Sequence, residues 1–189
     1  MRKLLCCVLF CAVAAFPAFA QMGGQSAPST DPLATGVKNA FKSVSGYLAA
    51  SSTKMPEENY GMRAGTDAKV RTFGQIIGHV ANANYLYCAR AKGEKNPNTE
   101  DLEKTTAKAD LVKALQASLD YCSEVYNPLT DASATAMVTI NGRNGQQIQT
   151  PRLTILWQNV AHNNEEYGNL VGYFRMKDIV PPSSDRSGM

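Results

Sequence analysis

Two side chains near the C-terminal end of the chain have the types and the spacing of a metal-ligand pair. His162 and Glu166 are four residues apart, and the stretch from Thr150 to Pro182 has the period of one long helix. Both side chains therefore point to one helix face, about one turn apart. This face flanks an apolar stripe and should look toward the interior. A buried imidazole and a buried carboxylate need polar partners, and a divalent metal ion is one partner that suits both.

The chain contains only two histidines, and the other one lies in a different predicted helix. His79 follows Ile76 by three residues and adjoins Val80, which places it at the edge of an apolar helix face. A histidine in such a place is commonly a hydrogen-bonded core residue. Glu165 and Glu166 would equally suit a solvated helix face. The residues alone leave a metal site and ordinary polar groups as two open interpretations.

Four segments with the helical period would position these side chains. Apolar residues recur at steps of three and four in each segment, and Trp157 is expected in the core with them. The pattern predicts an all-α fold, a four-helix bundle over residues 31–182. The expected helices are 32–51, 70–91, 105–126 and a last one with Thr150 as N-cap, Pro151 inside its first turn and Pro181-Pro182 as its stop.

The connection between the third and fourth helices is longer and departs from the helical period. Residues 137–140 favour a strand, Asn-Gly turn dipeptides follow at 141–142 and 144–145, and residues 146–149 could return as a second strand. A small hairpin and an irregular connection fit this pattern equally well.

The first twenty residues have the organisation of a secretory signal peptide. Arg2 and Lys3 precede an apolar run over residues 4–15, and the small residues of Ala18-Phe19-Ala20 suit cleavage. The apolar run is short for a membrane span. We therefore expect cleavage after residue 20 and a periplasmic or secreted protein with no stable membrane span; an uncleaved anchor is the alternative.

The 169 residues that would remain are enough for one domain with a full core. Residues 21–30 are expected to be a disordered leader and residues 183–189 a flexible tail. Removal of Arg2 and Lys3 leaves 17 basic residues against 16 acidic ones. A nearly neutral chain gives no reason to expect binding to nucleic acid.

Two cysteines remain after the first twenty residues, Cys88 and Cys122. An oxidising compartment would favour a disulfide between them. Both, however, lie near the C-terminal ends of consecutive predicted helices, and these ends are far apart when the two helices are antiparallel. A disulfide needs Cα atoms within about 7 Å, so we expect two buried free thiols.

His79 in the second predicted helix and the His162 and Glu166 pair in the fourth resemble the DinB-like (DinB/YfiT) four-helix-bundle superfamily, and two longer stretches look like its exported branch. The stretches are MPEENYGMRAGTDAKVRTFGQIIGHVANANYLYCARAKGEKNP at 55–97 and NNEEYGNLVGYFRMKDIVPPSS at 163–184. The resemblance covers nearly all of the chain after the signal peptide. It implies a bundle in which three side chains hold a divalent metal, commonly one histidine of the second helix and two histidines four apart on the fourth.

Carried over to this chain, the resemblance makes His79 and His162 the two histidine ligands. Glu166 stands where the third histidine usually stands, and Glu165 is a second candidate because it lies on nearly the same face. Two histidines and one carboxylate suit Fe(II), and similar ligand sets hold Zn or Ni. The glutamate is also compatible with weaker metal binding or a lost site.

The resemblance also implies two classes of function. Characterised relatives include metal-dependent transferases and isomerases that use low-molecular-weight thiols, so a metal-dependent transferase or hydrolase acting on a small-molecule substrate is the first hypothesis. The alternative is a non-catalytic bundle that binds a partner and has a structural or degenerate metal site. An adjoining pocket would favour the enzyme. Some relatives pair, so a homodimer is compatible with either hypothesis.

Overall fold

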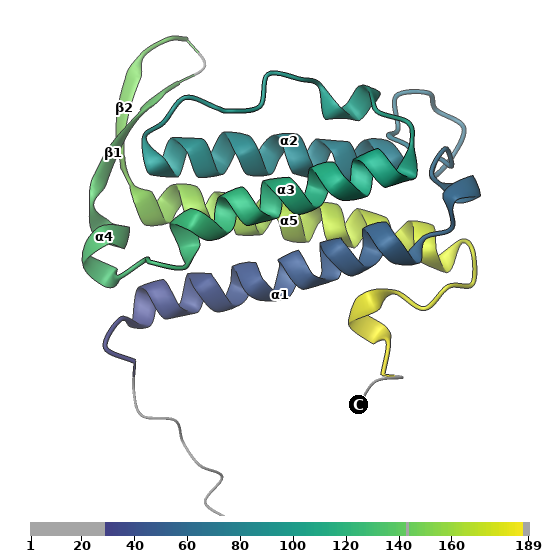
Figure 1. Cartoon of the computed structure of the whole chain (residues 1–189), viewed down its shortest axis with the longest axis horizontal. Helices are drawn as coiled ribbons and strands as arrows, with labels where there is room; N and C mark the ends of the chain where they lie inside the picture. The colour runs from purple at the N-terminus through teal and green to yellow at the C-terminus, as the bar shows by residue number, and fades with distance from the viewer. Residues whose placement is uncertain (1–28, 143, 187–189) are drawn as a thin grey trace, which may run out of the picture.

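The computed structural model describes residues 29–142 and 144–186. The expected signal peptide and nearly all of the expected leader lie outside these described residues. Four long helices pack into a bundle, which confirms the predicted all-α fold (Figure 1). The helices are α1 (Pro32–Lys54), α2 (Phe73–Lys92), α3 (Lys108–Tyr126) and α5 (Arg152–Arg175). Within the described part of the chain, no helix is long and apolar enough to cross a membrane.

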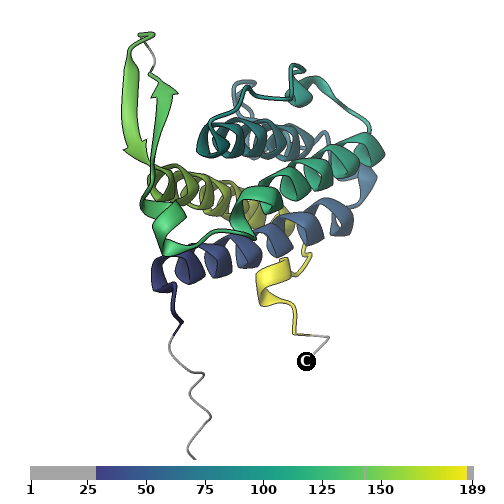
Figure 2. The same cartoon turned by 60° about the vertical axis from the view of Figure 1, so that its left-hand side comes forward.

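The helices do not simply alternate in direction. Figures 1 and 2 show that α2 and α3 run the same way, while α1 and α5 run opposite to them. The cause is the connection over residues 93–107, which returns along the length of α2 before α3 begins. A short 3-10 helix in this connection, η2 (Leu102–Lys104), packs against α2. A second short 3-10 helix, η1 (Glu57–Asn59), lies between α1 and α2.

Gly78 is the point at which the returning connection touches α2. A Cβ atom on this glycine would lie 2.3 Å from the carbonyl oxygen of Leu102. Asn82, one turn further along, accepts hydrogen bonds at its Oδ1 from the Leu102 backbone N–H at 3.3 Å and from the Asn98 side chain at 3.0 Å. The close approach brings Glu103 next to the residue that follows Gly78, which is His79.

Replacing Gly78 by alanine should lower the free energy of unfolding by about 1–3 kcal/mol, because the new methyl group meets backbone that cannot rotate away. Gly46 is the matched control, since it lies on the exposed face of α1, and no described atom outside the backbone of its own helix and its two chain neighbours would come within 4 Å of an added Cβ. Gly46→Ala should gain about 0.5–1 kcal/mol from the better helix propensity of alanine. Urea denaturation measures both changes, and equal shifts in the two variants would show that the close approach is not tight.

Cys88 and Cys122 form a disulfide with a Cα–Cα distance of 5.3 Å, so the expectation of two free thiols is wrong. That expectation assumed antiparallel consecutive helices. Because α2 and α3 run in the same direction, their C-terminal ends lie at the same end of the bundle (Figure 1). Both cysteines are fully buried.

The connection between α3 and α5 contains a short helix and a hairpin. Helix α4 (Asp131–Thr135) is followed by β1 (Met137–Asn141) and β2 (Gln147–Pro151). The two strands pair antiparallel, with Met137 opposite Pro151 and Ile140 opposite Ile148. Of the two alternatives that the sequence left open, the structure shows the hairpin.

The last long helix begins one residue later than predicted, at Arg152. Thr150 was expected as its N-cap, but it lies in β2, paired with Val138. Pro151 is the residue before the first helical turn, and no side chain caps it. The Arg152 backbone N–H instead donates to the Ala136 carbonyl at 2.9 Å, which joins the start of α5 to the hairpin.

The helix also ends before the two prolines that were expected to stop it. It ends at Arg175, and Asp178 then takes a left-handed backbone conformation with φ 57°. The chain continues into η3 (Pro182–Ser184), where the Ser183 backbone N–H donates to the Tyr167 hydroxyl at 2.8 Å. The expected flexible tail is therefore ordered against the bundle up to residue 186.

The core is built where the helices face one another, and it is rich in aromatic side chains. Phe73 packs edge-on against Phe174, with ring centroids 5.7 Å apart. Trp157 was expected in this core, but 44% of it is exposed. On α5 it lies beside the apolar stripe rather than within it, because Leu156 and Val160 occupy the inward positions.

Candidate metal centre

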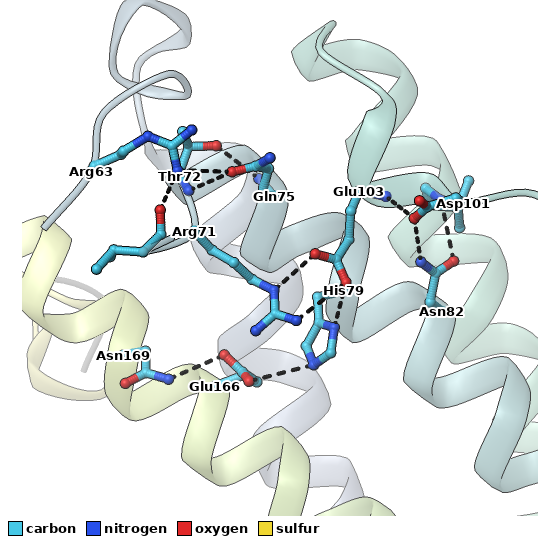
Figure 3. A network of polar contacts seen from close by, with 12 residues as sticks. Arg63, Arg71, Thr72, Gln75, His79, Asn82, Asp101, Glu103, Glu166 and Asn169 are labelled. Atoms are coloured by element: carbon cyan, nitrogen blue, oxygen red, sulfur yellow. Dashed lines mark hydrogen bonds and ion pairs between the residues drawn. The ribbon is translucent and has the colours of Figure 1, made fainter. Parts of the chain in front are cut away.

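Two facing helices bring together the three side chains that the sequence singled out. His79 comes from α2, and His162 and Glu166 come from successive turns of α5. One potential ligand atom from each lies within 4.8 Å of the other two. The imidazole rings meet edge to face, with centroids 5.0 Å apart. In Figure 3 the Glu166 carboxylate points at the His79 ring, and Glu166 Oε1 lies 3.6 Å from His79 Nε2.

His162 has a buried ring nitrogen that no described residue satisfies. Its Nε2 atom is shielded from solvent and has no hydrogen-bond partner within residues 29–142 and 144–186. Burial lowers the pKa of this histidine, and the nearby His79 lowers it further, against the opposite effect of Glu166 and Glu165. His162 is thus kept neutral, which is the form that coordinates a metal. A buried polar atom without a partner is uncommon and calls for an explanation such as an ion.

The two adjacent glutamates of α5 are separated by the helix geometry. Glu166 is only 6% exposed and accepts a hydrogen bond from the Asn169 side chain at 3.1 Å (Figure 3). Glu165 is exposed. The structure therefore brings Glu166 to the histidines and leaves Glu165 outside the cluster, although both were candidates from spacing alone.

Glu103 fixes the orientation of the His79 ring. Its Oε1 lies 2.6 Å from His79 Nδ1, and because a carboxylate only accepts, the proton of a neutral ring is on Nδ1 (Figure 3). The lone pair of Nε2 then faces Glu166. A carboxylate behind a histidine is the usual partner of a metal-ligating imidazole, since it holds the tautomer and raises the basicity of the ligand.

Arg71 completes this arrangement from the loop that directly precedes α2. Its Nε donates to Glu103 Oε2 at 2.8 Å, and its backbone carbonyl accepts a hydrogen bond from the Tyr173 hydroxyl. Burial by itself raises the pKa of Glu103, but the hydrogen bonds from Arg71 and His79 outweigh it and lower the pKa overall. Glu103 is therefore an anion, and the bond to it raises the pKa of Arg71.

These contacts leave acceptor atoms facing one another across the cluster. His79 Nε2 and Glu166 Oε1 are 3.6 Å apart, and both carry lone pairs when His79 is neutral. A proton on His79 would relieve this one contact. It would not supply a partner for the buried Nε2 of His162. A cation at the centre of the three groups would satisfy all of them, so the donor set fits a divalent metal.

Sequence reasoning missed Glu103 and Arg71. Neither belongs to a helix with the bundle period, and Glu103 reaches His79 across 24 sequence positions. The only local trace of this contact is Gly78, whose missing side chain admits the connection. A glycine inside a helix has many causes, so it could not have identified the partner.

Comparisons with known proteins identify the family of this chain and a solved structure with a similar fold. The sequence profile described as the DinB superfamily matches residues 40–169. A crystal structure of a DinB-like protein from Bacillus cereus ATCC 10987 superposes with a TM-score of 0.64, over 78% of this chain and 95% of that one. The two sequences are 14% identical, so this likeness concerns the fold alone. The curated proteins contain no match to the chain.

Proposed function

Since this chain belongs to the DinB superfamily, we propose that it is a metal-binding protein whose divalent ion is held by His79, His162 and Glu166. The observation that carries the proposal is the convergence of the three groups at a buried nitrogen of His162 that has no hydrogen-bond partner among the described residues. Two imidazoles and one carboxylate suit Zn, Ni or Fe(II).

The proposal extends to chemistry on a small molecule, either transfer of a group or hydrolysis. A bound divalent ion supplies Lewis-acid activation of a substrate. The protein residues supply position and charge: Glu103 holds the His79 ring, and Arg71 offsets the charge of Glu103. A pocket of about 280 Å³ adjoins Glu166 and has Arg71 in its wall. Space for a ligand beside the site favours an enzyme over a purely structural metal.

A non-catalytic bundle with a degenerate site is the second candidate. The observation that favours it is the contact between His79 and Glu166, because a protonated His79 could form an ion pair there. In this case the cluster would bind no metal and would only stabilise the packing of α2 on α5.

We also propose that the protein works outside the cytoplasm, in the periplasm or as a secreted protein. The organisation of the first twenty residues supports export. The buried disulfide between Cys88 and Cys122 is an independent support, because disulfides persist mainly in oxidising compartments.

The test of the ligand set is a comparison of two neighbouring glutamates. Glu166→Gln should weaken zinc binding by about 100-fold or more, because the amide is a poor ligand and its charge is lost. Glu165→Gln removes the same charge from the exposed side of α5 and should leave the affinity within a factor of about three. Competition with a chromophoric chelator measures both constants. Equal affinities in the two variants would remove Glu166 from the site.

Glu103 should matter for metal binding without being a ligand. Glu103→Gln should weaken zinc binding by about 10–100-fold, because the amide no longer holds the Nδ1 proton of His79 as strongly. Glu100 lies in the same connection with an exposed side chain, so Glu100→Gln is the matched control and should bind zinc as the wild type does. An unchanged affinity in Glu103→Gln would mean that the 2.6 Å contact has no effect on the site.

A further inference from the structure

The pocket beside Glu166 is bounded by a short loop and by two helices. The loop is closed by a β-bridge between Arg63 and Thr72, and it carries Lys69 and Arg71 over the ends of α2 and α5. Figure 3 shows Arg71 reaching from this loop toward Glu166 and His79. We call this space, of about 280 Å³, the Arg71 pocket, and the side chains in its wall include Lys69, Val70, Arg71, Ile76, Glu166 and Tyr173.

The charged groups of the Arg71 pocket are two cations and one carboxylate. Arg71 directs Nε and Nη2 at Glu103, which engages one edge of its guanidinium. Lys69 has an exposed side chain, and within the described part of the chain its ammonium forms no ion pair. The carboxylate is Glu166, whose charge would be offset by an ion held with the two histidines. With that ion bound, the pocket has an excess of positive charge.

The rest of the pocket wall is apolar except for Asn169, which donates to Glu166, and the Tyr173 hydroxyl, which donates to the Arg71 carbonyl. Val70 contributes from the loop and Ile76 from α2, and the ring of Tyr173 closes the side toward α5. A ligand that fits this surface has an anionic end for the cations and a short apolar body for these side chains. Its anionic end would lie on the Glu166 side of the metal site.

We propose that the Arg71 pocket binds the carboxylate of a small organic acid with a short apolar body, next to the metal. This inference rests on the proposed metal site, because an ion there is needed to offset Glu166. Lys69 is the residue that most directly selects for negative charge. Unlike Arg71, it makes no contact with Glu103, so changing it leaves the support of His79 intact.

The experiment is a calorimetric titration of the zinc-loaded protein with benzoate and with its neutral analogue benzamide. Benzoate should bind more tightly than benzamide in the wild type. Lys69→Met keeps the aliphatic stem but removes the charge, and it should weaken benzoate binding by about fivefold without changing benzamide binding. Lys113→Met removes the same charge from an exposed position on α3 and should behave as the wild type does.

Zinc content, measured on every sample before the titration, separates two kinds of failure. If the protein holds zinc but Lys69→Met binds benzoate as tightly as Lys113→Met does, the carboxylate site is wrong and the metal site stands. If benzamide binds the wild type as well as benzoate does, the selection for negative charge is likewise wrong. If the protein takes up no zinc, the proposed function fails, and this inference fails with it.

Discussion

Replacing His162 by alanine is expected to weaken zinc binding by at least about 100-fold while the bundle stays folded. The substitution removes one of the three proposed ligands, and the two that remain would hold zinc poorly. It also removes the ring nitrogen that has no partner in the described structure. The loss of that unsatisfied group, worth about 1–3 kcal/mol, opposes the cost of the lost packing. The metal-free variant should therefore unfold at nearly the urea concentration of the metal-free wild type.

His79→Ala should lose zinc to the same extent, but for this variant a larger loss of stability is expected. His79 is one of the two side chains that hydrogen-bond the Glu103 carboxylate, so its removal leaves this carboxylate with Arg71 alone. Gln158→Ala is the matched control, because Gln158 is exposed on α5 one turn before His162. Circular dichroism checks that each variant is folded. Full zinc content in either histidine variant would contradict the assignment of the site.

Removing the disulfide should have the largest effect on stability. Cys88 and Cys122 are separated by 34 residues, and a crosslink over a loop of this length restricts the unfolded chain by about 4 kcal/mol in the chain-entropy estimate. The double variant Cys88→Ala/Cys122→Ala should therefore lose about 3–4 kcal/mol of unfolding free energy. Urea denaturation under oxidising conditions measures the difference.

A reducing agent provides the control for this effect. Reduction should destabilise the wild type to nearly the level of the double variant, and the double variant itself should not respond. Because both cysteines are buried, reduction should proceed through unfolding and be slow under native conditions. A wild type whose unfolding midpoint does not change on reduction would contradict the crosslink.

The helices of this fold could be predicted from the sequence, but their directions could not. The period of apolar residues is a local property, and each of the four predicted helices is present with its bounds shifted by a few residues. The direction of α3 depends on how the connection over 93–107 returns along α2, and that path is set by long-range contacts at Gly78 and Asn82. The assumption that neighbouring helices are antiparallel placed the two cysteines at opposite ends of the bundle, although they form a disulfide.

Part of the candidate site could likewise be predicted from the sequence, and part could not. His162 and Glu166 share a helix face because of their spacing, so their proximity follows from the sequence alone. The resemblance to a family added His79 from another helix. Glu103 could be predicted neither from spacing nor from the resemblance. It lies in an irregular connection that brings it to His79, and no helical period identifies it as a site residue. Trp157 was misplaced because a position at the edge of an apolar stripe is compatible with either environment.

The most direct test of the metal site is elemental analysis of the protein, purified without an affinity tag or a chelator. We expect about one equivalent of a divalent metal per chain, bound by the His79, His162 and Glu166 cluster. A protein that contains no metal, and takes up none after incubation with Zn, Ni, Mn and Fe(II), would contradict it. The cluster would then be a former metal site that binds no ion, and an ion pair in it would join α2 to α5.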